Sequence, residues 1–225
     1  MRKSLLLLAV LALLSGCNKA DTVSYAGVEA GLLGSGQFTS DNGVTMTVDG
    51  NEGAFDILTT RRVLLSYQTH PVESAARITI DLRALWEAEI VQPAAIPAMP
   101  EEVDDTPLGV TGAWFSGGYM NLLTEFKAVD PARCTFSIDF TVNANGPVLR
   151  LRLDGSEDAE GTPEKQASFV CVPMGVIVQA FDQYCLSLGR AVVSPVPVRL
   201  QWTGYASEGG TAVLLEKEGS YTPAS

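Results

Sequence analysis

Apolar and polar positions along the first half of the chain predict short β-strands. Four segments have the residue pattern of partly buried strands: 37–39, 44–48, 62–67 and 77–82. The first two flank Ser40-Asp41-Asn42-Gly43, and an Asn-Gly step tolerates the positive φ of a tight turn, which predicts a β-hairpin. Segment 84–91, which carries Trp86, fits either a short helix or a last strand. We therefore expect a small antiparallel sheet in this half.

The second half of the chain predicts more strands and one helix. Strand patterns occur at 110–115, 119–126, 135–142, 148–153, 168–172 and 196–202. Alternation is clearest at 135–142 and 148–153, and strands with one buried and one solvated side favour a sandwich or a barrel. Prolines at the start of 196–202 predict an edge strand. Apolar residues at helical spacing from 177 to 188 predict a helix that ends at Gly189.

Segment 93–108 predicts a linker between two domains. Prolines at its start are followed by an acidic run that includes Asp104 and Asp105. Proline favours an extended course, and an acidic run is expected to stay in solvent. We therefore predict an N-terminal domain at 31–92 and a C-terminal domain at 109–225.

The start of the chain predicts a signal peptide and a lipid anchor. Two basic residues precede an apolar run at 5–14, which ends in Leu14-Ser15-Gly16-Cys17. This ending resembles the lipobox of bacterial lipoproteins, in which the cysteine thiol takes the lipid. We therefore predict a lipoprotein signal peptide at 1–16, palmitate-type lipid on Cys17 and a tether at 17–30.

The same residues predict a location in the bacterial cell envelope. The apolar run is too short to span a hydrocarbon core of about 30 Å, so the membrane contact should be the lipid on Cys17. Asn18, and not an aspartate, follows that cysteine, which favours the outer membrane. Whether the protein faces the periplasm or the cell surface stays open.

The net charge of the mature chain limits the kinds of partner that are expected. Cleavage before Cys17 leaves 13 Lys and Arg residues against 26 Asp and Glu residues, a formal charge of −13. Phosphate binding needs clustered basic residues, and here they are scattered. Nucleic acid is therefore excluded as an expected partner.

Three cysteines remain in the mature chain besides Cys17, and they allow at most one internal disulfide. Cys171 with Cys185 is the preferred pair, and buried free thiols are the alternative. Cys134 is left over in either case. The sequence has no Cys-x-x-Cys and no Cys/His cluster, so no metal site is expected.

Catalytic chemistry is not predicted. The chain has one histidine, His70, which precedes a proline in an apparent turn and is interpreted as a loop residue. Neither a nucleophile elbow nor a phosphate-binding loop occurs in the required strand-to-helix context. The acidic segment 154–161 resembles a calcium loop only weakly and is interpreted as a solvated hairpin loop. We expect no catalytic residue and no cofactor, and hence no enzyme.

Two further segments resemble the NigD-like lipoproteins. Arg62-Val63-Leu64-Leu65-Ser66-Tyr67 is similar to the Arg-Val strand of that family. Trp114-Phe115-Ser116-Gly117-Gly118-Tyr119-Met120-Asn121-Leu122 is similar to its W-x-x-G-G-Y-L-N-L motif. The resemblance implies a mainly β fold, with a small N-terminal OB-like barrel followed by a C-terminal antiparallel β-sandwich. It also implies an envelope lipoprotein, for which a role in bacteriocin immunity has been suggested.

The second motif also has a physical interpretation. Gly117 and Gly118 allow a bulge or sharp bend between two strands, and Trp114 and Tyr119 can pack across it. We expect Trp114, Gly117, Gly118, Tyr119 and Asn121 to be structural. The alternative is an exposed aromatic platform for a ligand.

Two functions are favoured by these patterns, ahead of a hydrolase that uses only carboxylates and that would need two acids facing each other across a cleft. The first is a non-enzymatic envelope lipoprotein that binds another envelope protein or protects the cell, as a bacteriocin-immunity protein does. The alternative is an envelope glycan-binding module, because OB-type barrels can bind sugars. The aromatic residues that could stack on a sugar are Trp86, Trp114, Trp202 and Tyr205.

Overall fold

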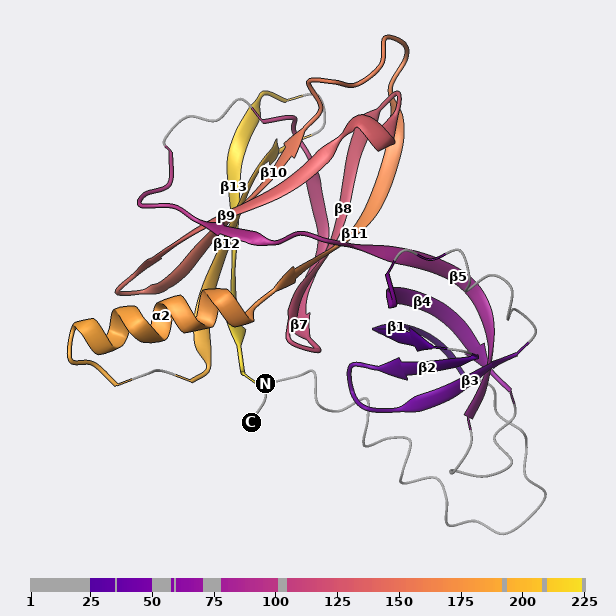
Figure 1. The fold of residues 1–225 in the computed structure, drawn as a ribbon. Helices are drawn as coiled ribbons and strands as arrows, with labels where there is room; N and C mark the ends of the chain where they lie inside the picture. The colour runs from indigo at the N-terminus through magenta and orange to yellow at the C-terminus, as the bar shows by residue number, and fades with distance from the viewer. Residues whose placement is uncertain are drawn as a thin grey trace.

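The computed structural model describes residues 25–34, 36–49, 58, 60–70, 78–100, 105–191, 194–207 and 210–223. The predicted signal peptide, Cys17 and the tether up to residue 24 lie outside these residues. The described part is mainly β, as predicted, with one sheet of eight strands and one of five (Figure 1).

The first five strands form a closed barrel. They are β1 (Ala26–Gly34), β2 (Gln37–Ser40), β3 (Thr45–Asp49), β4 (Arg62–Thr69) and β5 (Ile78–Ile90). β1 pairs antiparallel with both β2 and β4, and β3 pairs in parallel with β5, which closes the ring. This pairing pattern is that of an OB-type barrel, so the predicted OB-like fold is confirmed. Phe38, Val63, Leu65 and Ile80 fill the barrel and are fully buried.

The predicted hairpin is confirmed at β2 and β3. Gly43 has a φ of 82° in the turn between them, which is the conformation that the Asn-Gly step predicts. The ambiguous segment around Trp86 belongs to a strand, because β5 continues for 13 residues. Its last part, Ala88–Ile90, pairs in parallel with Phe169–Cys171 and thereby joins the barrel to the rest of the molecule.

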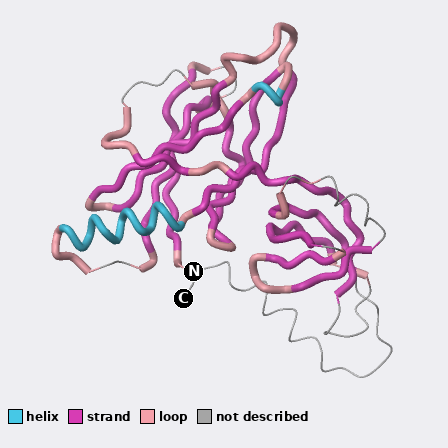
Figure 2. The backbone as a smooth tube through the Cα atoms, viewed as in Figure 1, coloured by secondary structure: helices cyan, strands magenta, loops and turns pink. Residues whose placement is uncertain are grey.

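The remaining elements build a sandwich closed at one end by a helix. They are β6 (Pro93–Ala95), β7 (Gly109–Ser116), β8 (Tyr119–Ala128), a 3-10 turn (Pro131–Arg133), β9 (Thr135–Asn143), β10 (Gly146–Asp154), β11 (Glu164–Pro173), α2 (Gly175–Ser187), β12 (Val196–Tyr205) and β13 (Ala212–Tyr221). The eight-stranded sheet has the order β3-β2-β1-β4-β5-β11-β8-β7, and the five-stranded sheet β13-β12-β10-β9-β6. α2 contacts β9 and β10, and Figure 2 shows it lying along the edge of the sandwich away from the barrel.

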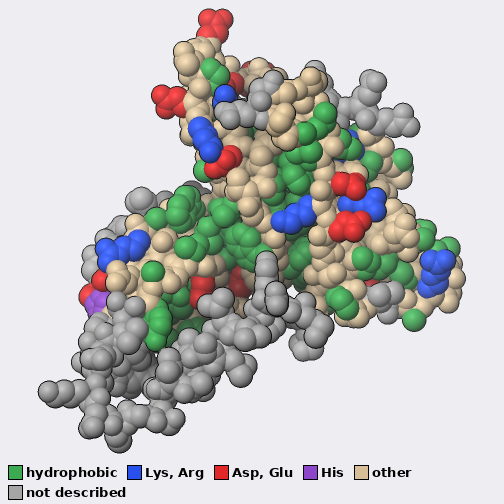
Figure 3. All heavy atoms as spheres, turned by 180° about the vertical axis from the view of Figure 1, so that it is seen from behind, with side chains coloured by type: hydrophobic (Ala, Val, Ile, Leu, Met, Phe, Trp, Pro, Cys, Tyr) green, Lys and Arg blue, Asp and Glu red, His purple; other side chains and the backbone are tan. Residues whose placement is uncertain are grey.

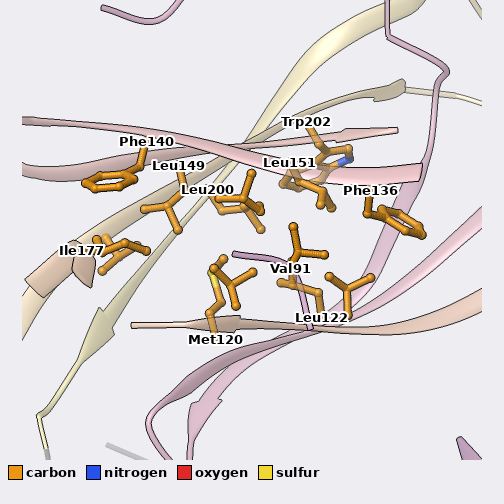
Figure 4. Packing of buried hydrophobic residues seen from close by; sticks show 14 of the residues in the cluster. Val91, Met120, Leu122, Phe136, Phe140, Leu149, Leu151, Ile177, Leu200 and Trp202 are labelled. Atoms are coloured by element: carbon orange, nitrogen blue, oxygen red, sulfur yellow. The ribbon is translucent and has the colours of Figure 1, made fainter. Parts of the chain in front are cut away.

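The main core lies between the two sheets of the sandwich. Met120 and Leu122 of β8 face Leu149 and Leu151 of β10, while Ile177 of α2 fills one end (Figure 4). All five side chains are at most 2% exposed. The apolar faces of the alternating strands therefore pack in this shared core, as the predicted sandwich requires.

Four sequence predictions need correction, two of them at segment boundaries. The sheets are mixed, because β10 pairs in parallel with β12 and β6 with β9, so the sandwich is not wholly antiparallel. β12 is an interior strand, because β13 pairs with it along its whole length. Part of the predicted tether, from Ala26, belongs to β1 and pairs with β4. Part of the predicted linker, Pro93–Ala95, is strand β6.

The prediction that the acidic run of the linker stays in solvent is also wrong at one residue. Asp105 has a side chain only 3% exposed, because its carboxylate accepts a hydrogen bond of 2.8 Å from Nε of Arg152. A neighbouring guanidinium supplies the charge that allows burial. The division into two domains at this segment stays a prediction, while the hydrogen-bonded sheet runs through both.

No helix among the described residues has the length and the apolar character that crossing a membrane requires.

Candidate functional site

The two motif segments meet at one buried arginine. Arg62 opens β4, and its side chain is 2% exposed. Its Nη1 and Nη2 donate to the two carboxylate oxygens of Asp41 at 3.0 and 2.9 Å. Nη2 also donates to Oδ1 of Asn121 at 2.6 Å, and Nε contacts Sγ of Cys171 at 3.2 Å. A buried guanidinium requires this degree of pairing to offset its lost hydration.

The partners of Arg62 are themselves connected. Ser116 donates its hydroxyl to Oδ2 of Asp41 at 2.5 Å, and Nδ2 of Asn121 donates to Oγ of Ser116 at 2.9 Å. Asp41 also donates its backbone N–H to the carbonyl of Ala30. The network therefore ties the β2–β3 turn and β4 of the barrel to the β7–β8 hairpin of the sandwich. We call Arg62, Asp41, Ser116, Asn121 and Cys171 the junction network.

Protonation states at the junction follow from burial and pairing. Burial is the largest single influence and by itself would lower the pKa of Arg62, but the hydrogen bonds and charge interactions with Asp41 and Cys171 together outweigh it, and the pKa of Arg62 is raised. Burial raises the pKa of the Cys171 thiol to about 11, although Arg62 opposes the shift. At neutral pH the guanidinium of Arg62 is therefore charged and the thiol of Cys171 is protonated.

The glycine pair forms the turn of the β7–β8 hairpin. Gly117 has φ 58° and Gly118 φ 82°, between the paired residues Ser116 and Tyr119. Two consecutive positive φ values are those of a two-residue hairpin turn, which glycine adopts without strain. A Cβ at Gly117 would lie 2.3 Å from Oδ1 of Asp41, so this glycine also lets the barrel approach.

The motif aromatics pack at the same junction. Trp114 stacks on Phe169 with ring centroids 6.0 Å apart and planes inclined by 12°. The guanidinium carbon of Arg62 lies 4.1 Å from the ring centroid of Tyr119, in cation–π geometry. Both rings border a small buried cluster that includes Ala88. These contacts support a structural role for the motif and argue against an exposed platform made by Trp114 and Tyr119.

The preferred disulfide is not formed. Cys134, Cys171 and Cys185 are all free thiols. Cys171 points to the junction network, whereas Cys185 on α2 packs in the sandwich core, in a different cluster. A strand and a helix that are neighbours in sequence therefore present their sulfurs to separate clusters.

The four aromatic residues proposed for sugar stacking do not converge. Trp202 is buried in the sandwich core, and Trp114 is covered by its stack on Phe169. Trp86 and Tyr205 are 38% and 54% exposed, but they belong to β5 and β12, which lie in different sheets. The sequence could not show this separation.

An apolar strip lies on the outer face of the barrel. Val28 and Leu32 of β1 are 61% and 54% exposed, and Trp86 of β5 is 38% exposed. Leu64 of β4 connects them, because it pairs with Trp86 on one side and with Ala30, between Val28 and Leu32, on the other. Hydrophobic side chains also gather where the barrel meets the sandwich in the view from behind (Figure 3). We call the exposed side chains Val28, Leu32 and Trp86 the apolar strip; Leu64 between them is buried.

Two cavities open on the sandwich. One of about 530 Å³ lies at the end of β12 and β13, where Arg199 and Glu218 form an ion pair of 3.2 Å. The other, of about 710 Å³, is lined by residues that include Glu125, Lys165 and Tyr205. Among the described lining residues each cavity has a single carboxylate, whereas glycoside hydrolysis uses two.

Two carboxylates of the acidic segment 154–161 accept backbone hydrogen bonds, one from within the loop and one from the segment that follows β8. Asp158 accepts backbone N–H bonds from Val129 and Asp130 at 2.9 and 2.7 Å. These bonds lower the pKa of Asp158, and a bond from Ser156 lowers the pKa of Asp154. The segment is a loop, as predicted, but it is not a hairpin, because β10 and β11 belong to different sheets.

Comparisons with known proteins identify the fold. No family model and no curated protein matches the sequence. The structure is similar to a NigD-like immunity protein from Bacteroides caccae ATCC 43185, with 20% identity, a TM-score of 0.59, and 89% of this chain and 98% of that chain covered. It is also similar to a predicted lipoprotein from Bacteroides fragilis NCTC 9343, with 16% identity, a TM-score of 0.61, and 90% and 100% covered. The NigD-like resemblance seen in the sequence thus extends to the fold of nearly the whole chain.

Proposed function

We propose that this protein is a lipid-anchored protein of the bacterial envelope that binds another envelope protein and catalyses no reaction. Protection of the cell, as by a bacteriocin-immunity protein, is the role that we propose for this binding. The lipobox-like ending at Cys17, the Asn18 that favours the outer membrane, and the fold shared with a NigD-like immunity protein and a predicted lipoprotein support the proposal.

The anchor has a direct test. Labelling with a palmitate analogue in cells should mark the wild-type protein and leave the Cys17→Ser variant unmarked, and the variant should leave the membrane fraction. Equal label in both proteins would overturn the anchor. A second cysteine variant, Cys134→Ser, serves as the matched control and should keep its label.

The apolar strip is the observation that carries the binding proposal. Clustered exposed apolar side chains on a folded domain are typical of interaction surfaces, and tryptophan is enriched at the centres of such surfaces. The side chains of the strip lie on β1 and β5, which both pair with β4 in a closed barrel, so their spacing is fixed before binding. Such preorganisation lowers the entropic cost of association.

Charge indicates the chemistry of the partner. The mature chain carries a formal charge of −13, from 13 basic and 26 acidic residues. Complementary charge speeds encounter between proteins, and like charge suppresses it. We therefore propose a protein partner with a basic surface around an apolar patch, and we expect its binding to weaken as salt concentration rises.

Site-specific cross-linking tests this partner. A photoreactive amino acid at position 32 should give an adduct with a basic envelope protein in living cells, and the same amino acid at position 205 should not. Leu32 and Tyr205 are equally exposed, so the comparison controls for accessibility. Identical adducts from both positions, or none from position 32, would contradict the proposal.

Reconstitution separates the protein partner from a glycan. The purified partner should bind the Trp86→Ala variant at least tenfold more weakly than wild type, while Tyr205→Ala binds normally. The expected loss comes from the apolar area that Trp86 would bury against the partner. Sugar-specific binding on a glycan array that Trp86→Ala abolishes would instead favour the glycan-binding module.

A further inference from the structure

Closure of the barrel brings together three metal-ligating side chains that are distant in the sequence. Asp49 is the last residue of β3, His70 directly follows β4, and Asp81 lies in β5. The parallel register of β3 and β5 pairs Asp49 with Asp81. The backbone N–H of His70 donates to the carbonyl of Thr79 at 2.8 Å, which holds the imidazole beside β5. The backbone of three strands therefore sets the positions of all three residues.

The donor atoms of these residues converge. Nε2 of His70 lies 2.8 Å from Oδ1 of Asp81 and 3.8 Å from Oδ2 of Asp49, and one donor atom of each residue lies within 4.8 Å of the others. Zinc binds histidine nitrogen and carboxylate oxygen at about 2.0–2.2 Å in tetrahedral geometry, which places ligand atoms roughly 3.3 Å apart. The two distances from the imidazole lie on either side of that value, so small side-chain rotations would centre an ion.

We propose that Asp49, His70 and Asp81 bind a divalent transition-metal ion, with Zn²⁺ as the defining probe. An imidazole with two carboxylates suits zinc and its neighbours, whereas Ca²⁺ takes six to eight oxygen ligands. The two carboxylates balance the charge of the ion. All three side chains are partly exposed, so the ion enters from solvent and water completes its coordination.

The position of the site predicts what the ion does. It links β3 and β5 at their pairing and adds the end of β4, so it holds the strands that close the barrel. A ligand that binds the folded state and not the unfolded chain raises the melting temperature. The site is therefore a metal clamp on the barrel, independent of the apolar strip and of the proposed partner.

Titration of the full chain tests the site. The protein is purified in detergent through a tag without histidine, stripped with a chelator and titrated with Zn²⁺, Mg²⁺ and Ca²⁺ by calorimetry. We expect one Zn²⁺ per chain and a higher melting temperature with Zn²⁺, and at least tenfold weaker binding of Mg²⁺ and Ca²⁺. Tight binding of Ca²⁺ or Mg²⁺ in place of Zn²⁺ would overturn the proposed ligand class.

Four variants decide which residues bind. Asp49→Asn, His70→Gln and Asp81→Asn should each weaken Zn²⁺ binding at least tenfold and abolish the rise in melting temperature. Glu157→Gln removes an exposed carboxylate from the β10–β11 loop and should bind as wild type does. Far-UV circular dichroism without metal checks each fold, and the two aspartate variants decide the outcome if His70→Gln unfolds. Wild-type affinity in the aspartate variants, or no Zn²⁺ binding by the wild type, would overturn the proposal.

Discussion

Arg62 and Asp41 form a bidentate ion pair across the junction of barrel and sandwich, with side chains only 2% and 8% exposed. The acceptor comes from a turn of the barrel that also contacts the β7–β8 hairpin. Burial of a charged group destabilises the folded state strongly unless an oppositely charged partner is present. The buried guanidinium at this junction therefore depends on a single carboxylate for its counter-charge.

Replacement of Asp41 should be costly. In Asp41→Asn the guanidinium of Arg62 stays buried without a counter-charge, and breaking a buried pair in this way costs about 3–5 kcal/mol. Urea denaturation measures the loss in free energy of unfolding. Glu125→Gln, which breaks the exposed pair with Lys165, is the control and should cost about 0–1 kcal/mol. Equal losses of stability in the two variants would show that the buried junction pair contributes no more than an exposed ion pair.

Removal of the arginine charge should partly rescue this variant. The double variant Arg62→Met, Asp41→Asn buries no unpaired ion, so we expect it to be more stable than Asp41→Asn alone. Denaturation of both single variants and the double variant gives the coupling free energy. A double variant that is no more stable than Asp41→Asn would contradict the assignment of the cost to the uncompensated charge.

The two motif glycines should differ in their tolerance of alanine. Gly117 and Gly118 both have positive φ, which costs an alanine about 1–2 kcal/mol. A Cβ at Gly118 meets nothing within 4 Å, whereas at Gly117 it would lie 2.3 Å from Asp41. Gly117→Ala should therefore be the less stable variant by at least about 1 kcal/mol in urea denaturation, because it also disturbs the Arg62 pair. A larger loss for Gly118→Ala would refute this interpretation of the turn.

Local patterns predicted local elements well. The β2–β3 hairpin followed from Asn42-Gly43, and the alternation of 148–153 predicted β10, because turn chemistry and strand period act over a few residues. β13 was missed because most of its side chains are exposed: β12 holds it by backbone pairing, which leaves little trace in hydrophobicity. The interior place of β12 was unpredictable for the same reason.

Contacts between distant segments could not be predicted. Asp41 had no signal beyond its place in a turn, and its pairing with Arg62 requires knowledge of how the barrel meets the β7–β8 hairpin. The cluster of Asp49, His70 and Asp81 could not be predicted either, because Asp49 and Asp81 become neighbours only through the parallel pairing of β3 with β5. The resemblance of two motifs indicated which segments matter, but not that they touch.

Thiol chemistry should match the absence of a disulfide. Cys171 and Cys185 are buried, and the raised pKa of Cys171 lowers its thiolate fraction further, so neither should react with a thiol reagent at pH 8 in the native state. Unfolding in denaturant without reductant should expose Cys134, Cys171 and Cys185 as three alkylatable thiols. Mass spectrometry checks the count. A disulfide-linked peptide joining Cys171 to Cys185 would contradict the structure.

Acid should remove the stabilising effect of Asp158. Backbone N–H groups of Val129 and Asp130 hold the pKa of this carboxyl below its unfolded value of about 3.9, so its stabilisation is complete above that pH and is lost as the pH falls through the folded pKa. Asp158→Asn should therefore be less stable than wild type above about pH 5, and the difference should shrink below about pH 4. Urea midpoints across this range measure it, with Glu157→Gln as the neighbouring control that should show no such convergence. A difference that stays constant with pH would mean that the aspartate acts through its shape and not its charge.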